Sequence, residues 1–183
     1  MRNGSTAAPA AIKGKLVSKI RLLFSAMAVA LCLAAFQLQT AAPVAAASGT
    51  EAGAVLSFAG SQLNKPFRLG ATGLARYDCS GLVYRTFAEE GLLRRIGGER
   101  TARGYYNYFR NHGEVTSHPQ KGDLVVWAHK DQPVSHIGIF DGYNRWGQPM
   151  AISALINPYG VTRHRVNGID VPLKAYLHVS LTR

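Results

Sequence analysis

The chain has 183 residues, with 21 Lys and Arg against 10 Asp and Glu, a formal net charge of +11 and 47% hydrophobic residues. After residue 48 it contains no repeats or low-complexity tracts, which excludes a repeat protein. No Lys/Arg run with interleaved aromatic residues is present, so nucleic acid is not an expected partner. A basic surface suits other anionic polymers, including a bacterial cell wall.

The first 47 residues have the layout of a secretory signal peptide. Five basic residues and no acidic ones accompany an apolar run at 22–36, and the small-residue site Ala45–Ala47 follows. The alternative is a membrane anchor, but the run is shorter than the roughly 20 apolar residues that a span needs. We therefore expect export, with cleavage near Ala47 and residence in the cell envelope or outside the cell. Cys32 lies inside the apolar run, so Cys79 is the only cysteine expected in the mature protein.

Residues 48–183 suit one compact domain with one core. The leader holds five of the 21 basic residues and none of the 10 acidic ones, which leaves the mature part with a net charge of +6. This segment has no room for an appended wall-binding module. We expect a monomer that reaches its target through its charge or through a regulatory partner protein.

Apolar spacing predicts helices first and strands afterwards. Residues 49–66 and 80–93 have helical periodicity, and residues 101–113 form a short helix or an ordered loop. Short β-rich runs bounded by turn residues then predict strands at 123–128, 135–142, 150–155, 160–166 and 175–181. This order indicates an α+β domain with an antiparallel sheet.

Cys79 is placed where a thiol can be activated. Asp78 is a good N-cap for the helix that opens at Cys79 and Ser80. The positive end of a helix dipole and its free N–H groups lower the pKa of a thiol, so a nucleophile is expected here. The alternative is that Cys79 is a small buried hydrophobic residue, as free cysteines often are.

A thiolate nucleophile needs an imidazole to pair with it and to protonate the leaving group. Of the six histidines, His136 stands out because it opens the strand "HIGIF" directly after a turn. A third polar group should orient this imidazole. The strand-borne candidates are His164 in "VTRHRV" and Ser153 in "AISAL".

Four blocks of sequence follow one another along the chain: "DCSGLVYRTF", "RTARGYYNYF", "PQKGDLVVW" and "SHIGIFDG". Together they resemble the NlpC-type cell-wall cysteine peptidases of the papain-like superfamily. The likeness runs from about Val55 to Val166, in the order and spacing typical of that family.

The resemblance implies a papain-like α+β fold, with the nucleophile at a helix start and N-terminal helices packed on an antiparallel sheet. It implies that Cys79 is the nucleophile and His136 the general base and acid. It also implies that Asp78 and Ser80 contact the free amino terminus of the substrate. The implied reaction is hydrolysis of an amide bond in peptidoglycan stem peptides, usually between D-glutamate and the diamino acid. Neither a metal nor an organic cofactor is implied.

The sequence departs from the family pattern in two places. Many members carry a third polar residue, often histidine, in a "(V/I)-H-A" strand, whereas this chain reads "MAISAL", with Ile152 expected in that position. His164 could then reach His136 from the neighbouring strand, or Ser153 could serve instead. Leu69 stands where the family usually has an aromatic residue lining the cleft, which bears on specificity. Alternatives to the endopeptidase are a catalytically weak wall-binding module and a related peptidoglycan amidase.

Overall fold

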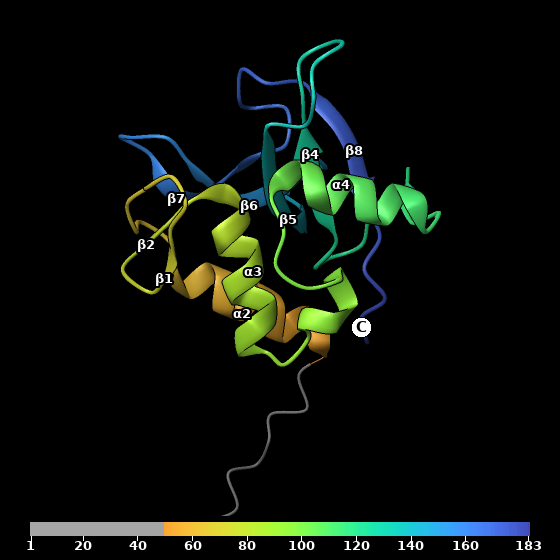
Figure 1. The fold of residues 1–183 in the computed structure, drawn as a ribbon, viewed down its shortest axis with the longest axis horizontal. Helices are drawn as coiled ribbons and strands as arrows, with labels where there is room; N and C mark the ends of the chain where they lie inside the picture. Colours follow the sequence, from red (N-terminus) through yellow and green to blue (C-terminus); the bar gives the residue numbers. More distant parts are fainter. Residues whose placement is uncertain (1–49) are drawn as a thin grey trace, which may run out of the picture. The chain divides into compact units, whose positions relative to one another are not determined.

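The structure, a computed structural model, describes residues 50–183, so the predicted leader lies outside the described residues. The described residues belong to one compact unit, Ser48–Arg183 (Figure 1). The helical elements are α2 (Glu51–Ser61), α3 (Cys79–Glu89), the 3-10 turn η1 (Leu93–Ile96) and α4 (Ala102–Asn111). The strands are β1 (Thr72–Gly73), β2 (Arg76–Tyr77), β3 (Val115–Thr116), β4 (Leu124–Trp127), β5 (His136–Tyr143), β6 (Pro149–Leu155), β7 (Gly160–Arg165) and β8 (Leu173–Leu177).

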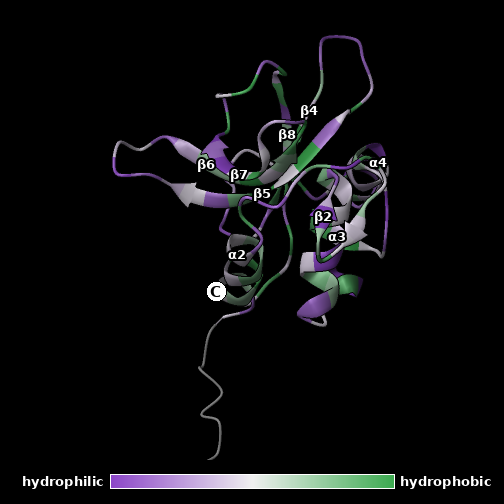
Figure 2. Ribbon diagram, turned by 90° about the vertical axis from the view of Figure 1, so that its left-hand side faces the viewer, coloured by the Kyte–Doolittle hydropathy of each residue, from purple (hydrophilic) through white to green (hydrophobic). Residues whose placement is uncertain are grey.

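Six strands form one antiparallel sheet in the order β3-β8-β4-β5-β6-β7. The short strands β1 and β2 pair with each other just ahead of α3. Figure 2 shows α2 and α3 together on one side of the strands. The predicted α+β fold, with N-terminal helices packed on an antiparallel sheet, is confirmed.

Each of the three α-helices α2, α3 and α4 begins at a residue whose side chain caps it. In all three cases a side-chain oxygen accepts a hydrogen bond from the backbone N–H three residues later, which satisfies one of the free donors of the first turn. The capping residues are Thr50 for α2, Asp78 for α3 and Thr101 for α4.

The helix predicted at 80–93 is shorter in the structure. α3 ends at Glu89, and Gly91 then takes a left-handed conformation with φ of 69°. The N–H of Leu92 donates back to the carbonyl of Phe87, which closes the helix end. The apolar residues after Gly91 continue in the separate turn η1.

The sheet carries a hydrophobic cluster on each face. The larger cluster joins α2, α3 and α4 to the strands through residues such as Val55, Leu82 and Ile137. The smaller cluster lies on the other face and is built on Trp127 and Phe140. Burial of these side chains supplies the main favourable term in folding.

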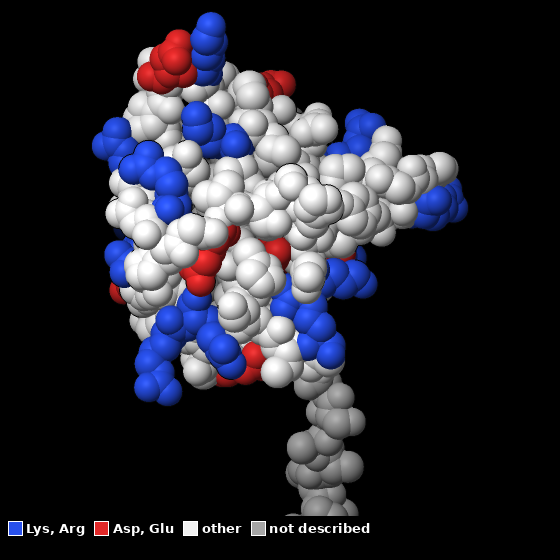
Figure 3. Space-filling model, turned by 90° about the vertical axis from the view of Figure 1, so that its right-hand side faces the viewer, with Lys and Arg blue, Asp and Glu red and all other residues white. Residues whose placement is uncertain are grey.

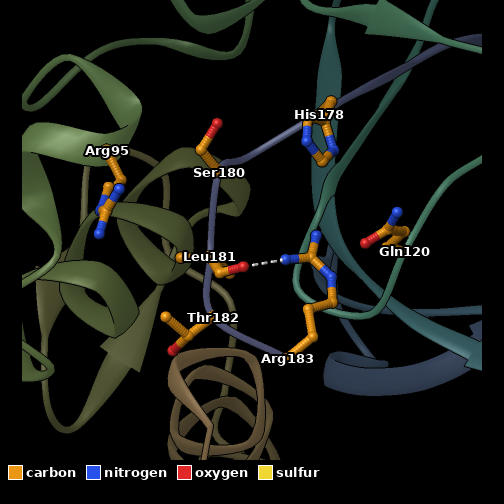
Figure 4. Close-up of a pocket in the computed structure, with 7 residues that line it drawn as sticks. All are labelled: Arg95, Gln120, His178, Ser180, Leu181, Thr182 and Arg183. Carbon is orange, nitrogen blue, oxygen red and sulfur yellow. Dashed lines mark hydrogen bonds between the residues drawn. The ribbon is translucent and has the colours of Figure 1, made fainter.

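The C-terminal segment is held against the sheet by a buried carboxylate. Asp123, which is fully buried, accepts hydrogen bonds from the Val179 N–H and the Arg183 guanidinium. Arg183 also donates to the carbonyl of Leu181 (Figure 4). The strand predicted at 175–181 therefore lies earlier, at Leu173–Leu177, because the residues after it turn toward Asp123.

Basic side chains are spread over the surface. Figure 3 shows Lys and Arg distributed around one face, with no single concentrated patch. Among residues 50–183, no helix is both long enough and apolar enough to cross a membrane.

Candidate active site

Cys79 is the first residue of α3, and the preceding Asp78 caps that helix. One carboxylate oxygen of Asp78 accepts from the Gly81 N–H at 2.7 Å and from the Ser80 hydroxyl at 3.0 Å. The other accepts from the Gly70 N–H at 2.7 Å. Asp78 therefore joins the helix start to the loop before it and sets the direction in which α3 leaves.

Gly81 lets that loop lie directly on the first turn of α3. A Cβ at this position would collide with the carbonyl oxygen of Ala71. The N–H of Asp78 also donates to the Ala71 carbonyl, at 2.9 Å. The glycine of the "DCSG" motif is therefore needed for close backbone approach beside the nucleophile.

Burial dominates the electrostatics of Cys79. It raises the pKa of the thiol to about 11, and the Asp78 carboxylate adds to the rise. The backbone N–H groups of Ile137, Ser80 and Cys79 itself act in the opposite direction. The N–H groups at the helix start act in the expected direction, but desolvation of the thiolate outweighs them, so the expected net lowering of this pKa is wrong for the free protein.

His136 is the first residue of β5, as predicted. Burial lowers the pKa of its imidazole to about 4, and the nearby His164 lowers it further. Within the described residues no hydrogen bond joins the His136 ring to the Cys79 sulfur. The sulfur instead lies beside the N–H of Ile137, the next residue of β5. The structure therefore brings Cys79 to the start of the strand that carries His136.

Three side chains from adjacent strands form a row that begins at His136. Its Nε2 lies 2.9 Å from the Ser153 hydroxyl on β6, which lies 2.8 Å from Nε2 of His164 on β7. His164 Nδ1 lies 2.9 Å from the carbonyl oxygen of Arg165. Both candidates for the third polar residue are therefore present in one row, and Ser153 is the one that contacts His136.

Ile152 does not lie beside His136, contrary to expectation. Ile152 pairs with Ile139 of β5, and both side chains belong to the cluster that faces the helices. Side chains alternate along a strand, so the next residue, Ser153, faces the side of the sheet that carries His136.

Trp127 supports both histidines and was not singled out from the sequence. It pairs with His136 across β4 and β5, and the two ring centroids lie 5.1 Å apart. The centroid of His164 lies 5.8 Å from the Trp127 ring. The indole N–H donates to the carbonyl of Val166 at 2.9 Å, which holds the ring in place. A large aromatic residue ending the strand antiparallel to the "HIGIF" strand is the signal that could have identified it.

A groove of about 370 Å³ lies at the start of α3. Asp78 and Ser80 line it, together with Glu99 and Arg100, which the sequence analysis did not single out. Leu69 stands where the family usually has an aromatic residue lining the cleft. Its side chain is 83% exposed, so it does not form a buried wall of the groove. Among the described residues no cluster of His, Cys, Asp and Glu has the arrangement of a metal site.

Comparison with known proteins identifies the class. The family model "NlpC/P60 family" matches residues 64–168, more than half of the chain. The chain therefore belongs to the NlpC/P60 family. The match includes the Cys79 helix and all three strands of the His136–Ser153–His164 row.

Solved structures share the fold at low sequence identity. NlpC1 from Trichomonas vaginalis is 22% identical, with a TM-score of 0.57 over 73% of this chain and 45% of its own. An NlpC/P60 family protein from Bacillus cereus ATCC 10987 is 21% identical, with a TM-score of 0.59 over 70% of this chain and 40% of its own. The NlpC/p60 domain of the peptidoglycan hydrolase SagA is 19% identical, with a TM-score of 0.52 over 69% of this chain and 97% of its own. This chain thus spans less than half of the first two proteins but nearly the whole SagA domain.

Proposed function

We propose that this protein is an exported cysteine peptidase that hydrolyses an amide bond in peptidoglycan stem peptides, between D-glutamate and the diamino acid. The observation that carries the proposal is the position of Cys79 at the start of α3, beside the strand that opens with His136. Membership of the NlpC/P60 family supports the same chemistry. The name of the SagA domain, a peptidoglycan hydrolase, supports the choice of substrate.

In the proposed mechanism, the thiol proton passes to His136 as the sulfur attacks the scissile carbonyl carbon. The free protein holds a neutral thiol and a neutral imidazole, so this transfer forms the thiolate during attack. The oxyanion accepts a hydrogen bond from the backbone N–H of Cys79. Collapse of this intermediate breaks the C–N bond, and His136 returns the proton to the leaving amine. Water, deprotonated by His136, then hydrolyses the thioester and regenerates the thiol.

The groove at the start of α3 is proposed to bind the amino terminus of the stem peptide. Asp78 and Ser80 lie in its wall, and Glu99 adds a second carboxylate to the same wall. A substrate ammonium group is a hydrogen-bond donor, which suits these acceptors. Asp78 already accepts three hydrogen bonds from the protein, so it would bind substrate while holding the helix start.

The proposal includes the organisation of the chain. Residues 1–47 act as a signal peptide, and residues 48–183 form a single catalytic domain that works as a monomer in the cell envelope or outside the cell. The net charge of +6 on residues 48–183 favours association with an anionic wall. A regulatory partner protein could supply further targeting.

The test is mass spectrometry of peptidoglycan fragments incubated with the protein, beside Cys79→Ala and His136→Ala. We expect new ends between D-glutamate and the diamino acid, and their loss in both variants. Ends at another bond that also depend on Cys79 would indicate a related amidase. Ends that persist in Cys79→Ala would overturn the proposed mechanism.

A catalytically weak wall-binding module is the second candidate. The observation that favours it is the raised pKa of Cys79, which leaves little thiolate in the free protein. Sedimentation with purified peptidoglycan separates the two candidates. Retention of the folded wild-type protein on the wall without cleavage of any fragment would favour the module.

A further inference from the structure

The row that starts at His136 runs diagonally across three strands. Ser153 pairs with Thr162 of β7, so His164, two residues further along β7, is its diagonal neighbour. On the other side of Ser153, Gly138 of β5 leaves room for the serine side chain. A Cβ on Gly138 would lie 2.9 Å from the Ser153 Cβ, too close for any side chain. The "H-x-G" glycine thus lets Ser153 approach His136.

The hydrogen bonds of this row have only one consistent direction when both histidines are neutral. A carbonyl oxygen can only accept, so His164 Nδ1 carries the proton and donates to Arg165. Its Nε2 is then an acceptor, and the Ser153 hydroxyl must donate to it. Because the Ser153 hydrogen is committed to His164, the Ser153 oxygen can only accept from His136 Nε2–H. His136 is thereby left with a bare Nδ1.

The surroundings keep the row neutral and complete. Burial lowers the pKa of both His136 and His164, which favours the uncharged rings that this direction requires. Ser153 is fully buried, and the two histidines satisfy its hydroxyl as donor and as acceptor. Trp127 lies against both imidazole rings and limits their reorientation.

We propose that Ser153 and His164 are positioning residues that together select the Nε2–H tautomer of His136, with the direction set by the Arg165 carbonyl. A serine hydroxyl alone would not choose, because it can rotate to donate to His136 as readily as it accepts. His164 makes the choice by taking the hydroxyl hydrogen. The consequence for catalysis rests on the proposed function: a bare Nδ1 accepts the thiol proton, and Nε2–H keeps donating to Ser153 after that proton arrives.

The first test is the tautomer of His136 in the free protein, read by NMR from its ring nitrogen shifts and their couplings to the ring protons. We expect the Nε2–H form to dominate in the wild type and a mixture of both forms in His164→Ala and Ser153→Ala. The matched control is His118→Ala, which removes an exposed histidine and should leave the His136 signals unchanged. A dominant Nε2–H form in both row variants would overturn the inference.

A second variant separates two roles of His164: its contact with the Ser153 hydroxyl and its hydrogen bond to the Arg165 carbonyl on β7. In His164→Asn the side-chain amide can still donate to the Arg165 carbonyl, but it is too short to reach the Ser153 hydroxyl. We expect His164→Asn to fold like the wild type and to show the same tautomer mixture as His164→Ala. Wild-type tautomer populations in a folded His164→Asn would show that Ser153 orients His136 without help, contrary to the proposal.

Kinetics gives an independent readout. Ser153→Ala and His164→Ala should each lower kcat by about tenfold to a hundredfold, because His136 is no longer held in the Nε2–H form. This loss is within what positioned acid–base catalysis contributes, and KM should stay close to the wild-type value. The double variant Ser153→Ala/His164→Ala should be no slower than the slower single variant, because one row is broken in each case. Multiplicative losses would contradict a shared row. The NMR result needs no substrate, so it stands or falls separately from the peptidase activity.

Discussion

Burial shifts the pKa values of both Cys79 and His136, and each shift favours the neutral form of the side chain. The thiol has its pKa raised to about 11 and the imidazole has its pKa lowered to about 4. Between these values the free protein holds a neutral pair. A thiolate then exists only in small amounts until a base removes the proton.

The pH dependence of alkylation tests this state. We expect the rate constant for reaction of Cys79 with iodoacetamide to rise about tenfold per pH unit from pH 6 toward 11, because the reactive thiolate becomes more abundant as pH approaches a raised pKa. The measurement is the mass of the alkylated protein against time, with the unfolded chain as the reference. A fast plateau at pH 5 to 8 would instead mean that an imidazolium–thiolate pair exists before substrate binds.

The sequence indicated which residues are candidates for the site, but it did not indicate the environment of their side chains. The positions of Cys79, His136 and Asp78 follow from local signals: a capping residue, a helix start and a strand opening after a turn. The pKa of Cys79 depends on how much of the fold covers it, which no local signal carries. This is why the expected direction of its shift was wrong.

Among the helices, the start of α3 is held by the hydrogen bonds that Asp78 accepts. Its carboxylate caps the helix and also accepts from the Gly70 N–H and the Ser80 hydroxyl. Thr101 caps α4 with a single exposed hydrogen bond. The two helices therefore offer a matched pair of caps.

We expect Asp78→Ala to lower the free energy of unfolding by about 2–3 kcal/mol and Thr101→Ala by about 1 kcal/mol. A lost cap costs about 1 kcal/mol, and Asp78→Ala also leaves the buried Gly81 N–H without a partner. The measurement is urea denaturation followed by circular dichroism. Equal losses in the two variants would mean that the contacts of Asp78 with Gly70 and Ser80 contribute nothing to stability.

The sheet shows which features of an element can be read from its sequence. Period-two patterning predicted β4, β5, β6 and β7 close to their observed bounds. It did not predict the irregular register between β5 and β6, where a bulge lies between Phe140 and Gly142. The "(V/I)-H-A" pattern of the family suggested Ile152 for the third polar position, whereas the observed register pairs Ile152 with Ile139 and turns Ser153 to the face that carries His136.

At the scale of the whole molecule, Asp123 connects the C-terminal segment to the sheet. Its carboxylate accepts from the backbone N–H groups of Gln120 and Val179 and pairs with Arg183, with His178 within 3.4 Å. The segment then reaches the start of α2, where the Ala52 N–H donates to the carbonyl of Thr182. The two ends of the described chain are therefore tied to one another and to β4.

We expect Asp123→Ala to destabilise the protein by about 3–5 kcal/mol, because its buried partners would be left unpaired. Arg183→Ala should cost only about 1–2 kcal/mol, because Asp123 keeps its backbone donors. Thermal and urea unfolding of both variants would measure the difference. A smaller loss in Asp123→Ala than in Arg183→Ala would contradict this role.

Short segments of the sequence were enough to indicate the fold class, the family resemblance, the helix that carries Cys79 and the strand that carries His136. Capping, periodicity and motif spacing are properties of short segments, so they can be read without coordinates. Three findings required the packed structure: Ser153 lies between His136 and His164, Trp127 lies against both rings, and burial raises the pKa of Cys79. Each of these depends on register and burial, which arise when segments distant in the chain pack together.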